Sequence, residues 1–184
     1  MKKEDLRNIN KAKRKEMLPE VVFEKSKKAS ENFLNNEIYK SSEVLMLYYP
    51  LGKETDTSLI LKNALADGKT VVYPITNTDT NEITPVVVDR KTDFSKGGYS
   101  VFEPIEKNEY KGTIDVILVP GIAFDKKGKR VGFGKGCYDR FLKRNDAIKV
   151  GYCYDFQIAD DIEIDSFDVD MDYLISESGM IVCE

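Results

Sequence analysis

The feature that most constrains the fold is a series of unbroken apolar segments separated by segments with helical periodicity. The clearest apolar segments are residues 43–49, 114–119 and 148–152. A strand that is apolar along its whole length is buried on both faces, as is typical of parallel sheets. The alternation therefore predicts an α/β protein with a three-layer α/β/α architecture, in which a mainly parallel sheet carries helices on both faces.

The remaining segments fit the same plan. Helices are expected at residues 3–17, 19–36 and 57–66, and further strands at 70–73, 83–88, 173–175 and 180–182. Residues 89–112 are predicted to be a long loop, and a loop of this length inside a compact domain suggests a cover over a site. No internal repeat or linker divides the 184 residues, so residues 1–184 are expected to form a single domain.

Composition excludes several classes of function. The sequence has no histidine, which excludes triads that use histidine as a base and zinc sites that use it as a ligand. Cys137, Cys153 and Cys183 are far apart and are expected to be free thiols. The sequence lacks an apolar leader and an apolar run of membrane-spanning length, so we expect a cytoplasmic protein. The net charge of -4 gives no reason to expect nucleic-acid binding.

Charge is distributed unevenly along the chain. Residues 126–149 are rich in Lys and Arg, whereas residues 150–184 carry many acids and neither cation. Two interpretations are open: solvated surface segments, or an anion site beside a carboxylate that holds a metal ion. The acidic run consists of Asp165, Asp168, Asp170 and Asp172. It does not have the spacing of an EF-hand loop, so solvated turn carboxylates are the alternative for most of its members.

A glycine-rich loop lies between an apolar strand and a helix expected to begin near Cys137. It contains Gly132, Gly134 and Gly136, with Lys135 between the last two. Glycines allow backbone N–H groups to approach an anion, and a helix N-terminus adds partial positive charge. The loop is neither a Walker A motif nor a dinucleotide fingerprint. It predicts phosphate binding, with a structural turn as the alternative, and Lys135 is placed to neutralise a transferring phosphoryl group.

Three segments follow or end apolar strands, where ligands bind in parallel sheets. They are residues 50–57, 74–77 and 120–136. Glu54 lies in the first of them and has no evident capping role. It is either an acceptor for the N–H groups of a heterocyclic substrate or a solvated side chain.

Together these segments resemble one enzyme family, over nearly the whole chain. The motifs are Pro120-Gly-Ile-Ala-Phe-Asp125, the loop Gly128-Lys-Arg-Val-Gly-Phe-Gly-Lys-Gly-Cys-Tyr-Asp-Arg140, and the upstream loop with Glu54. They are similar to those of the 5-formyltetrahydrofolate cyclo-ligase (5,10-methenyltetrahydrofolate synthetase) family. Two residues depart from the family pattern: Cys137 replaces the first Tyr of a Tyr-Tyr pair, and Val131 replaces Leu. The resemblance implies a fold like that of the NagB/RpiA/CoA-transferase group.

The resemblance also implies a reaction. A ligase of one-carbon metabolism would use ATP and Mg²⁺ to cyclise 5-formyltetrahydrofolate to 5,10-methenyltetrahydrofolate, releasing ADP and phosphate. The formyl oxygen would first be phosphorylated, which makes it a good leaving group. The partner would be a small-molecule folate, with or without an extended glutamate tail, and no nucleic acid or membrane is expected. The protein would be a monomer.

Roles carried over by matching position complete the expectation. The implied catalytic residues are Lys135 and Arg130, and the implied metal ligands are Asp139 and Asp168. The implied ATP-binding residues are Lys3, Arg7, Arg130, Val131, Gly132, Phe133, Gly134, Lys135, Gly136, Cys137 and Tyr138. The implied folate-binding residues are Tyr49, Glu54, Phe133, Gly134, Lys135, Gly136 and Cys137.

Two other functions are compatible with the sequence. One is a non-catalytic relative that binds nucleotide or RNA through the cationic loop, which Cys137 and the basic segment motivate. The other is a phosphosugar isomerase or CoA-transferase-like enzyme, for which fold analogy is the sole argument.

Overall fold

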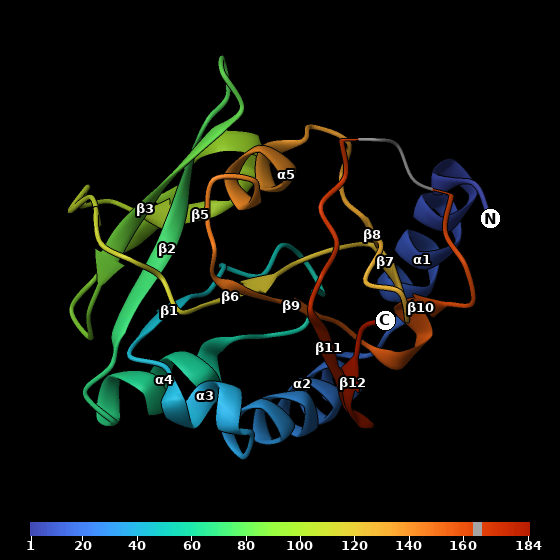
Figure 1. Cartoon of the computed structure of the whole chain (residues 1–184), viewed down its shortest axis with the longest axis horizontal. Coiled ribbons are helices and arrows are strands. Elements are labelled where there is room, and N and C mark those ends of the chain that lie inside the picture. Colours follow the sequence, from blue (N-terminus) through green and yellow to red (C-terminus); the bar gives the residue numbers. More distant parts are fainter. Residues whose placement is uncertain (164–166) are drawn as a thin grey trace.

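A seven-stranded sheet forms the centre of the computed structural model, which describes residues 1–163 and 167–184 (Figure 1). The strand order is β12-β11-β9-β6-β1-β2-β3. The bounds are β1 Val44–Met46, β2 Thr70–Asn77, β3 Glu82–Val88, β6 Val116–Val119, β9 Ile148–Tyr152, β11 Tyr173–Ser176 and β12 Gly179–Val182. The inner strands β11, β9, β6, β1 and β2 are parallel, and the edge strands β3 and β12 are antiparallel to their neighbours. The predicted mainly parallel α/β sheet is confirmed. Asp165 of the acidic run lies outside the described residues.

Alternate residues of the strands face two different layers, because successive side chains of a strand point to opposite faces. Three helices cover one face: α2 (Pro19–Leu34), α3 (Glu37–Ser41) and α4 (Ser58–Ala66) (Figure 1). Leu45 of β1 packs in the core on that side with Phe33 and Ile60. Its neighbour Met46 packs on the opposite side with Phe124 and Phe141. Continuous apolar strands are therefore buried on both faces.

The second face carries more β structure than the sequence predicts. Besides the short helix α5 (Cys137–Leu142) it holds a small sheet of β7 (Ala123–Asp125), β8 (Arg130–Val131) and β10 (Ile158–Ala159). The predicted loop 120–136 thus contains a hairpin. The buried carboxylate of Asp125 stabilises it by accepting hydrogen bonds from the backbone N–H groups of Lys127, Lys129 and Ile162, each at 3.0 Å.

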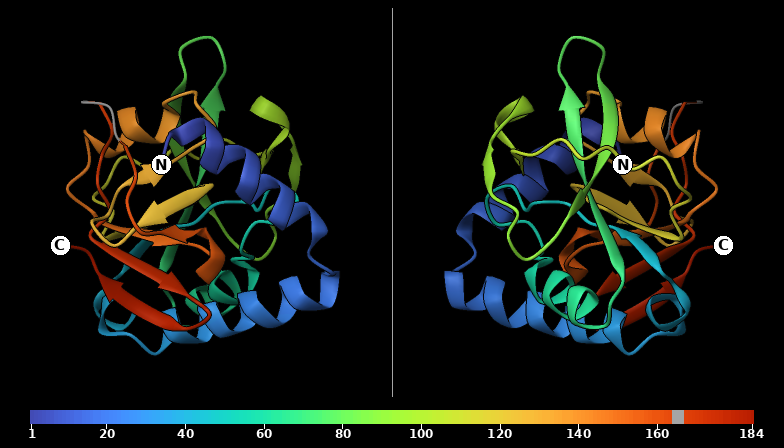
Figure 2. Two further views of the ribbon diagram at one scale, coloured as in Figure 1. Left: turned by 90° about the vertical axis from the view of Figure 1, so that its right-hand side faces the viewer. Right: turned by 90° about the vertical axis from the view of Figure 1, so that its left-hand side faces the viewer.

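Helix α1 (Lys3–Glu16) lies across the small sheet (Figure 2, left). Its Leu6 is buried in a cluster with Ala123, Val131 and Ile162. The side chain of Asn10 is also buried and donates to the carbonyl of Ile122 at 3.0 Å. These contacts explain why a helix with little apolar surface has a fixed place in the fold. They also bring its cationic residues to the cavity described below.

Two further segments differ from the expected elements. β2 continues beyond the predicted 70–73 because it pairs with β3 along its whole length, and the resulting hairpin projects from the molecule (Figure 2). The expected loop 89–112 contains the antiparallel strands β4 (Phe94–Lys96) and β5 (Phe102–Pro104), joined by the 3₁₀ turn η1 (Gly98–Ser100). A second 3₁₀ turn, η2, spans Asp155–Gln157. Within the described ranges, no helix combines the length and apolar character needed to cross a membrane.

Candidate functional site

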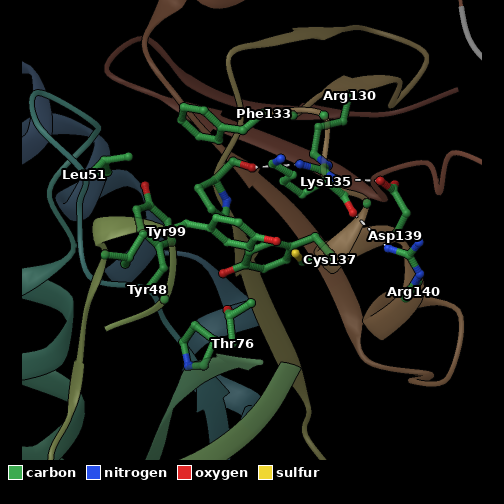
Figure 3. Close-up of a pocket in the computed structure, with 18 of the residues that line it drawn as sticks. Tyr48, Leu51, Thr76, Tyr99, Arg130, Phe133, Lys135, Cys137, Asp139 and Arg140 are labelled. Atoms are coloured by element: carbon green, nitrogen blue, oxygen red, sulfur yellow. Dashed lines mark hydrogen bonds and ion pairs between the residues drawn. The ribbon is translucent and has the colours of Figure 1, made fainter. Parts of the chain in front are cut away.

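A cavity of about 820 Å³ opens at the carboxyl ends of β1, β2 and β6. The three segments predicted from sequence meet there: Leu51 follows β1, Thr76 belongs to β2, and Pro120 follows β6. The second segment is part of strand β2 and not the loop expected at 74–77. Figure 3 shows Tyr48 and Leu51 at one end of this cavity and Asp139 at the other.

All but one of the residues implied by the family resemblance line this cavity. They are Lys3, Arg7, Tyr49, Glu54, Arg130, Gly132, Phe133, Gly134, Lys135, Gly136, Cys137, Tyr138, Asp139 and Asp168. Val131 is the exception. Its side chain is buried in the cluster with Leu6, and its carbonyl accepts a hydrogen bond from Ile122, so it does not contribute to the cavity wall.

The glycine loop adopts a conformation that needs glycine at particular positions. Gly134 has φ 96° and Gly136 has φ 69°, in the region that side-chain-bearing residues avoid. A Cβ on Gly132 would lie 2.7 Å from Nη1 of Arg130, so the missing side chain lets this guanidinium approach the loop. Arg7 Nε donates to the Gly132 carbonyl at 3.0 Å. Helix α5 has 6 residues, so backbone groups and side-chain cations, more than a helix dipole, supply the positive charge.

Arg130 is the most buried cation of the site, with 7% of its surface exposed. Its Nη1 donates to the Pro120 carbonyl at 3.2 Å, and its Nη2 pairs with Oδ2 of Asp139 at 3.2 Å (Figure 3). The guanidinium also lies 5.7 Å from the ring centroid of Tyr138. Its Nε is buried and has no hydrogen-bond partner. A buried donor left in this state is costly, so a ligand acceptor at Nε would be stabilising.

The two carboxylates expected to bind metal each carry an ion pair. Asp139 pairs with Arg130 and also accepts from the backbone N–H of Val169 at 3.2 Å. Asp168 pairs with Lys3. Across the described part of the chain, His, Cys, Asp and Glu side chains do not gather in groups of three or more that could hold a metal. Carboxylate oxygens suit Mg²⁺, which is often held by one or two carboxylates with phosphate oxygens and water, so the pair fits that ion in the presence of a phosphate ligand.

Glu54 is a buried carboxylate, and the interpretation of it as a solvated side chain is wrong. It is 5% exposed, and its Oε2 accepts from the backbone N–H of Leu51 at 2.8 Å. Its Oε1 is buried without a hydrogen-bond partner, 3.7 Å from Nη1 of Arg14. Burial raises the pKa of Glu54 from 4.5 to about 7, against the opposing effects of the Leu51 N–H and Arg14. Burial of this carboxylate costs free energy, and its Oε1 has no hydrogen-bond partner in the protein. Such a group on a cavity wall is suited to binding N–H donors of a ligand.

Several residues of the cavity wall received no role from the sequence or from the family resemblance. They include Tyr48, Thr76, Tyr99, Arg140 and Phe167. Tyr99 lies in η1 with φ 53°, and its hydroxyl donates to the side chain of Asn81. Its ring centroid is 5.5 Å from Nζ of Lys135. The position of Tyr99, an aromatic residue directly after Gly97 and Gly98 in a long loop, could have indicated from sequence that it lies at the site. Asn81 is also 3.9 Å from Sγ of Cys137, and burial raises the pKa of that thiol.

Comparison with known proteins finds relatives along nearly the whole chain. The model of the 5-formyltetrahydrofolate cyclo-ligase family matches residues 1–177. A Caenorhabditis elegans protein named probable 5-formyltetrahydrofolate cyclo-ligase is 30% identical over 178 residues, covering 89% of this chain and 83% of its own. The solved structure of Aquifex aeolicus 5,10-methenyltetrahydrofolate synthetase superposes with a TM-score of 0.84 at 32% identity, covering 98% of this chain and 92% of its own. For the Mycoplasma pneumoniae synthetase the TM-score is 0.77 at 26% identity, with coverage of 96% and 99%.

Proposed function

Because the chain belongs to the 5-formyltetrahydrofolate cyclo-ligase family and is an enzyme of that kind, we propose that it closes the ring of 5-formyltetrahydrofolate at the expense of ATP, with Mg²⁺. The products are 5,10-methenyltetrahydrofolate, ADP and phosphate. The observation that carries this proposal is that a cationic glycine loop and the buried acceptor Glu54 line the same cavity. A reaction between a phosphate donor and a heterocycle needs both kinds of recognition in one place.

The chemistry requires positioning more than a protein nucleophile. The formyl oxygen attacks the γ-phosphorus, the bond to the bridging oxygen breaks, and ADP leaves with that electron pair. N10 then attacks the formyl carbon, the activated oxygen leaves as phosphate, and the N10 proton is lost to water. A chain without histidine can support both steps, because charge neutralisation and alignment carry most of phosphoryl transfer.

The cations of the cavity are assigned to the nucleotide. Lys3 and Arg7 approach from α1, and Arg130 and Lys135 from the glycine-loop segment. Lys135 is exposed and flanked by glycines, so it is free to follow the phosphoryl group as charge develops. Arg130 has a fixed position and an unused Nε donor, which suits a static phosphate contact.

Asp139 and Asp168 are assigned to Mg²⁺, which when bound neutralises phosphate charge. Each carboxylate is paired with a cation assigned to ATP: Asp139 with Arg130, and Asp168 with Lys3. With ATP and Mg²⁺ bound, Arg130 and Lys3 would contact phosphate oxygens, and Asp139 and Asp168 would hold the metal. Each of these four side chains would then face an opposite charge in the ligand in place of the one it now faces in the protein.

The folate is assigned to the end of the cavity near Glu54. The pterin ring carries adjacent N–H donors, and the unpartnered Oε1 of Glu54 is available to accept one. Phe133 and Tyr49 are partly exposed and offer apolar faces to a planar ring. The glycine loop borders both ligands, so the γ-phosphate can meet the formyl oxygen there.

The proposal is tested by turnover of the purified protein. With ATP, Mg²⁺ and 5-formyltetrahydrofolate, the near-ultraviolet absorbance of the methenyl product should appear, and it should disappear when the metal is chelated. Lys135→Met should reduce turnover by about 100-fold or more while leaving thermal unfolding unchanged, because an exposed loop lysine supports little packing. Lys129→Met, in the adjacent hairpin turn and outside the cavity wall, is the matched control and should retain activity. Folded wild-type protein without turnover at high concentration would refute the proposal.

The two alternative functions considered from the sequence have less support. A non-catalytic role is not supported, because the family and the relatives are named as enzymes. The phosphosugar isomerase or CoA-transferase assignment is also unsupported, since the structural neighbours are methenyltetrahydrofolate synthetases. A cytoplasmic location, a monomeric state and binding of extended glutamate tails stay predictions from sequence and family.

A further inference from the structure

One face of α1 lies against the glycine loop. Arg7, Lys11 and Arg14 recur at helical spacing, which places them on the same side of the helix. Arg7 holds the Gly132 carbonyl. Lys11 and Arg14 lie 5.6 Å and 5.8 Å from the ring centroid of Phe133. This face of α1 therefore supports the loop that borders both proposed ligands.

Arg14 makes one contact that the other two cations of this face do not. Its Nη1 is 3.7 Å from Oε1 of Glu54, and the two side chains are 11% and 6% exposed. Glu54 lines the cavity, whereas Arg14 does not belong to its wall. Arg14 therefore stands behind Glu54 and is in a position to act on a ligand through it.

We propose that Arg14 is a positioning residue for the reaction: it keeps Glu54 ionised and aimed into the cavity as an acceptor for ring N–H donors of the folate, and its contact with Phe133 couples that acceptor to the glycine loop. This inference rests on the proposed function. It concerns a residue that neither the sequence motifs nor the family resemblance singled out.

The electrostatic surroundings of Glu54 support this role. From the loop after β1 the backbone N–H of Leu51 donates to Oε2, and from α1 the cation Arg14 faces Oε1. Two tyrosines complete the surroundings, Tyr48 after β1 and Tyr138 of α5. Burial raises the pKa of each, and the nearby charge of Glu54 adds to the rise, so both stay neutral. Among the described residues, Arg14 is thus the cation in ion-pair contact with Glu54.

Loss of the Arg14 cation should favour the protonated form of Glu54, which cannot accept a hydrogen bond at the protonated oxygen as a carboxylate does. Its pKa is about 7, so the carboxyl group is close to half ionised at neutral pH. Without Arg14 a larger share is protonated, and a protonated oxygen offers a donor where the ring also offers donors. Binding of the folate would then require deprotonation at higher pH.

The experiment compares Arg14→Gln, Arg14→Lys and the matched control Lys11→Gln, which removes a cation from the same helix face without touching Glu54. The first readout is a ¹³C NMR titration of the Glu54 carboxyl group in ligand-free protein. Its midpoint should move to higher pH in Arg14→Gln, return toward the wild-type midpoint in Arg14→Lys, and stay unchanged in Lys11→Gln. This arm needs no folate, so it judges the Arg14–Glu54 coupling even if the proposed function fails.

The second readout is calorimetric affinity for 5-formyltetrahydrofolate as a function of pH. Arg14→Gln should weaken binding about tenfold at pH 7, and the deficit should shrink at pH 9, where Glu54 is ionised in either protein. A structural defect would weaken binding equally at both values. An unchanged titration midpoint in folded Arg14→Gln, or a pH-independent loss of affinity, overturns the proposal. Wild-type protein that binds no folate overturns the proposed function instead.

Discussion

At the scale of single residues, the role proposed for Glu54 opposes the stability of the fold. Its carboxyl group is almost fully buried, one oxygen has no hydrogen-bond partner, and its pKa is raised to about 7. A carboxyl group whose pKa is raised on folding stabilises the protein least when it is ionised. Its contribution is therefore most favourable below the ordinary pKa of 4.5 and is lost as the pH rises from there to about 7.

Replacement of Glu54 by Gln should remove this cost. A shift from 4.5 to about 7 corresponds to about 3 kcal/mol at alkaline pH, and Gln can still accept from Leu51. Urea unfolding should show Glu54→Gln more stable than wild type by about 2–3 kcal/mol at pH 8, with little difference at pH 4, and the variant should lose folate affinity. Glu106→Gln, on an exposed loop, should show no such pH dependence. A stability difference of equal size at both pH values would contradict this account.

At the scale of elements, the β7–β8 hairpin positions Arg130 and is held by its turn. Gly128 in that turn has φ 85°, and a Cβ there would lie 2.3 Å from the carbonyl oxygen of Met171. The backbone N–H of Met171 in turn donates to the Gly128 carbonyl at 2.7 Å. The hairpin is therefore fixed to the segment that follows Asp168 by a contact that leaves no room for a side chain.

Gly128→Ala should be much more damaging than Gly68→Ala. Gly68, after α4, also has a positive φ of 74°, but nothing lies within 4 Å of its would-be Cβ. The Gly68 variant should lose about 1 kcal/mol from backbone strain alone. Gly128→Ala should lose at least about 2 kcal/mol more, because backbone must move, and its ATP affinity should fall with it. Thermal unfolding and nucleotide binding of both variants provide the measurement, and equal losses would argue against the clash.

The same hairpin shows where prediction from sequence stops. The strands of the large sheet were predictable because each is an apolar run between helices, and β9 was predicted with its observed bounds. β7, β8 and β10 are too short to show a periodicity. Asp125 helps to hold them together by accepting from the backbone N–H of Ile162, a partner distant in sequence that no local pattern reveals. β2 was predicted to end at residue 73, whereas Pro74 lies opposite Pro85 of the edge strand and the pairing continues to Asn77.

At the scale of the whole molecule, the site draws on both ends of the described chain. The family motifs predicted most of the residues of the cavity, since position in a motif is local information. The motifs could not predict the contacts between segments: that Arg14 lies behind the buried Glu54, that Lys3 pairs with Asp168, or that Lys135 lies over the Tyr99 ring. Val131 illustrates the converse, because it belongs to the motif and yet faces the core.

The segment from β4 to β5 is still predicted to act as a cover. Gly98, Tyr99, Val101 and Glu103 line the cavity, and Glu103 is tied to β2 by accepting from the Thr76 N–H at 2.9 Å. If the segment closes on the ligands, hydrogen exchange at residues 97–101 should slow several-fold when an ATP analogue and folate are both bound. Residues 106–109 of the neighbouring loop lie outside the cavity wall and serve as the internal control. Equal protection of both segments, or of neither, would argue against a cover.

The attachment of α1 has a consequence for the order of events during synthesis. Arg7, Asn10 and Lys3 find their partners 125, 112 and 165 residues further along the chain. On the ribosome α1 emerges long before Gly132, Ile122 or Asp168 exist, so it must wait while the sheet assembles. An amphipathic helix with a broad apolar face would be prone to wrong contacts during that delay. A helix composed mainly of Lys, Arg, Asn and Glu stays hydrated, and the proposed nucleotide site is completed only when nearly all of the described chain has been made.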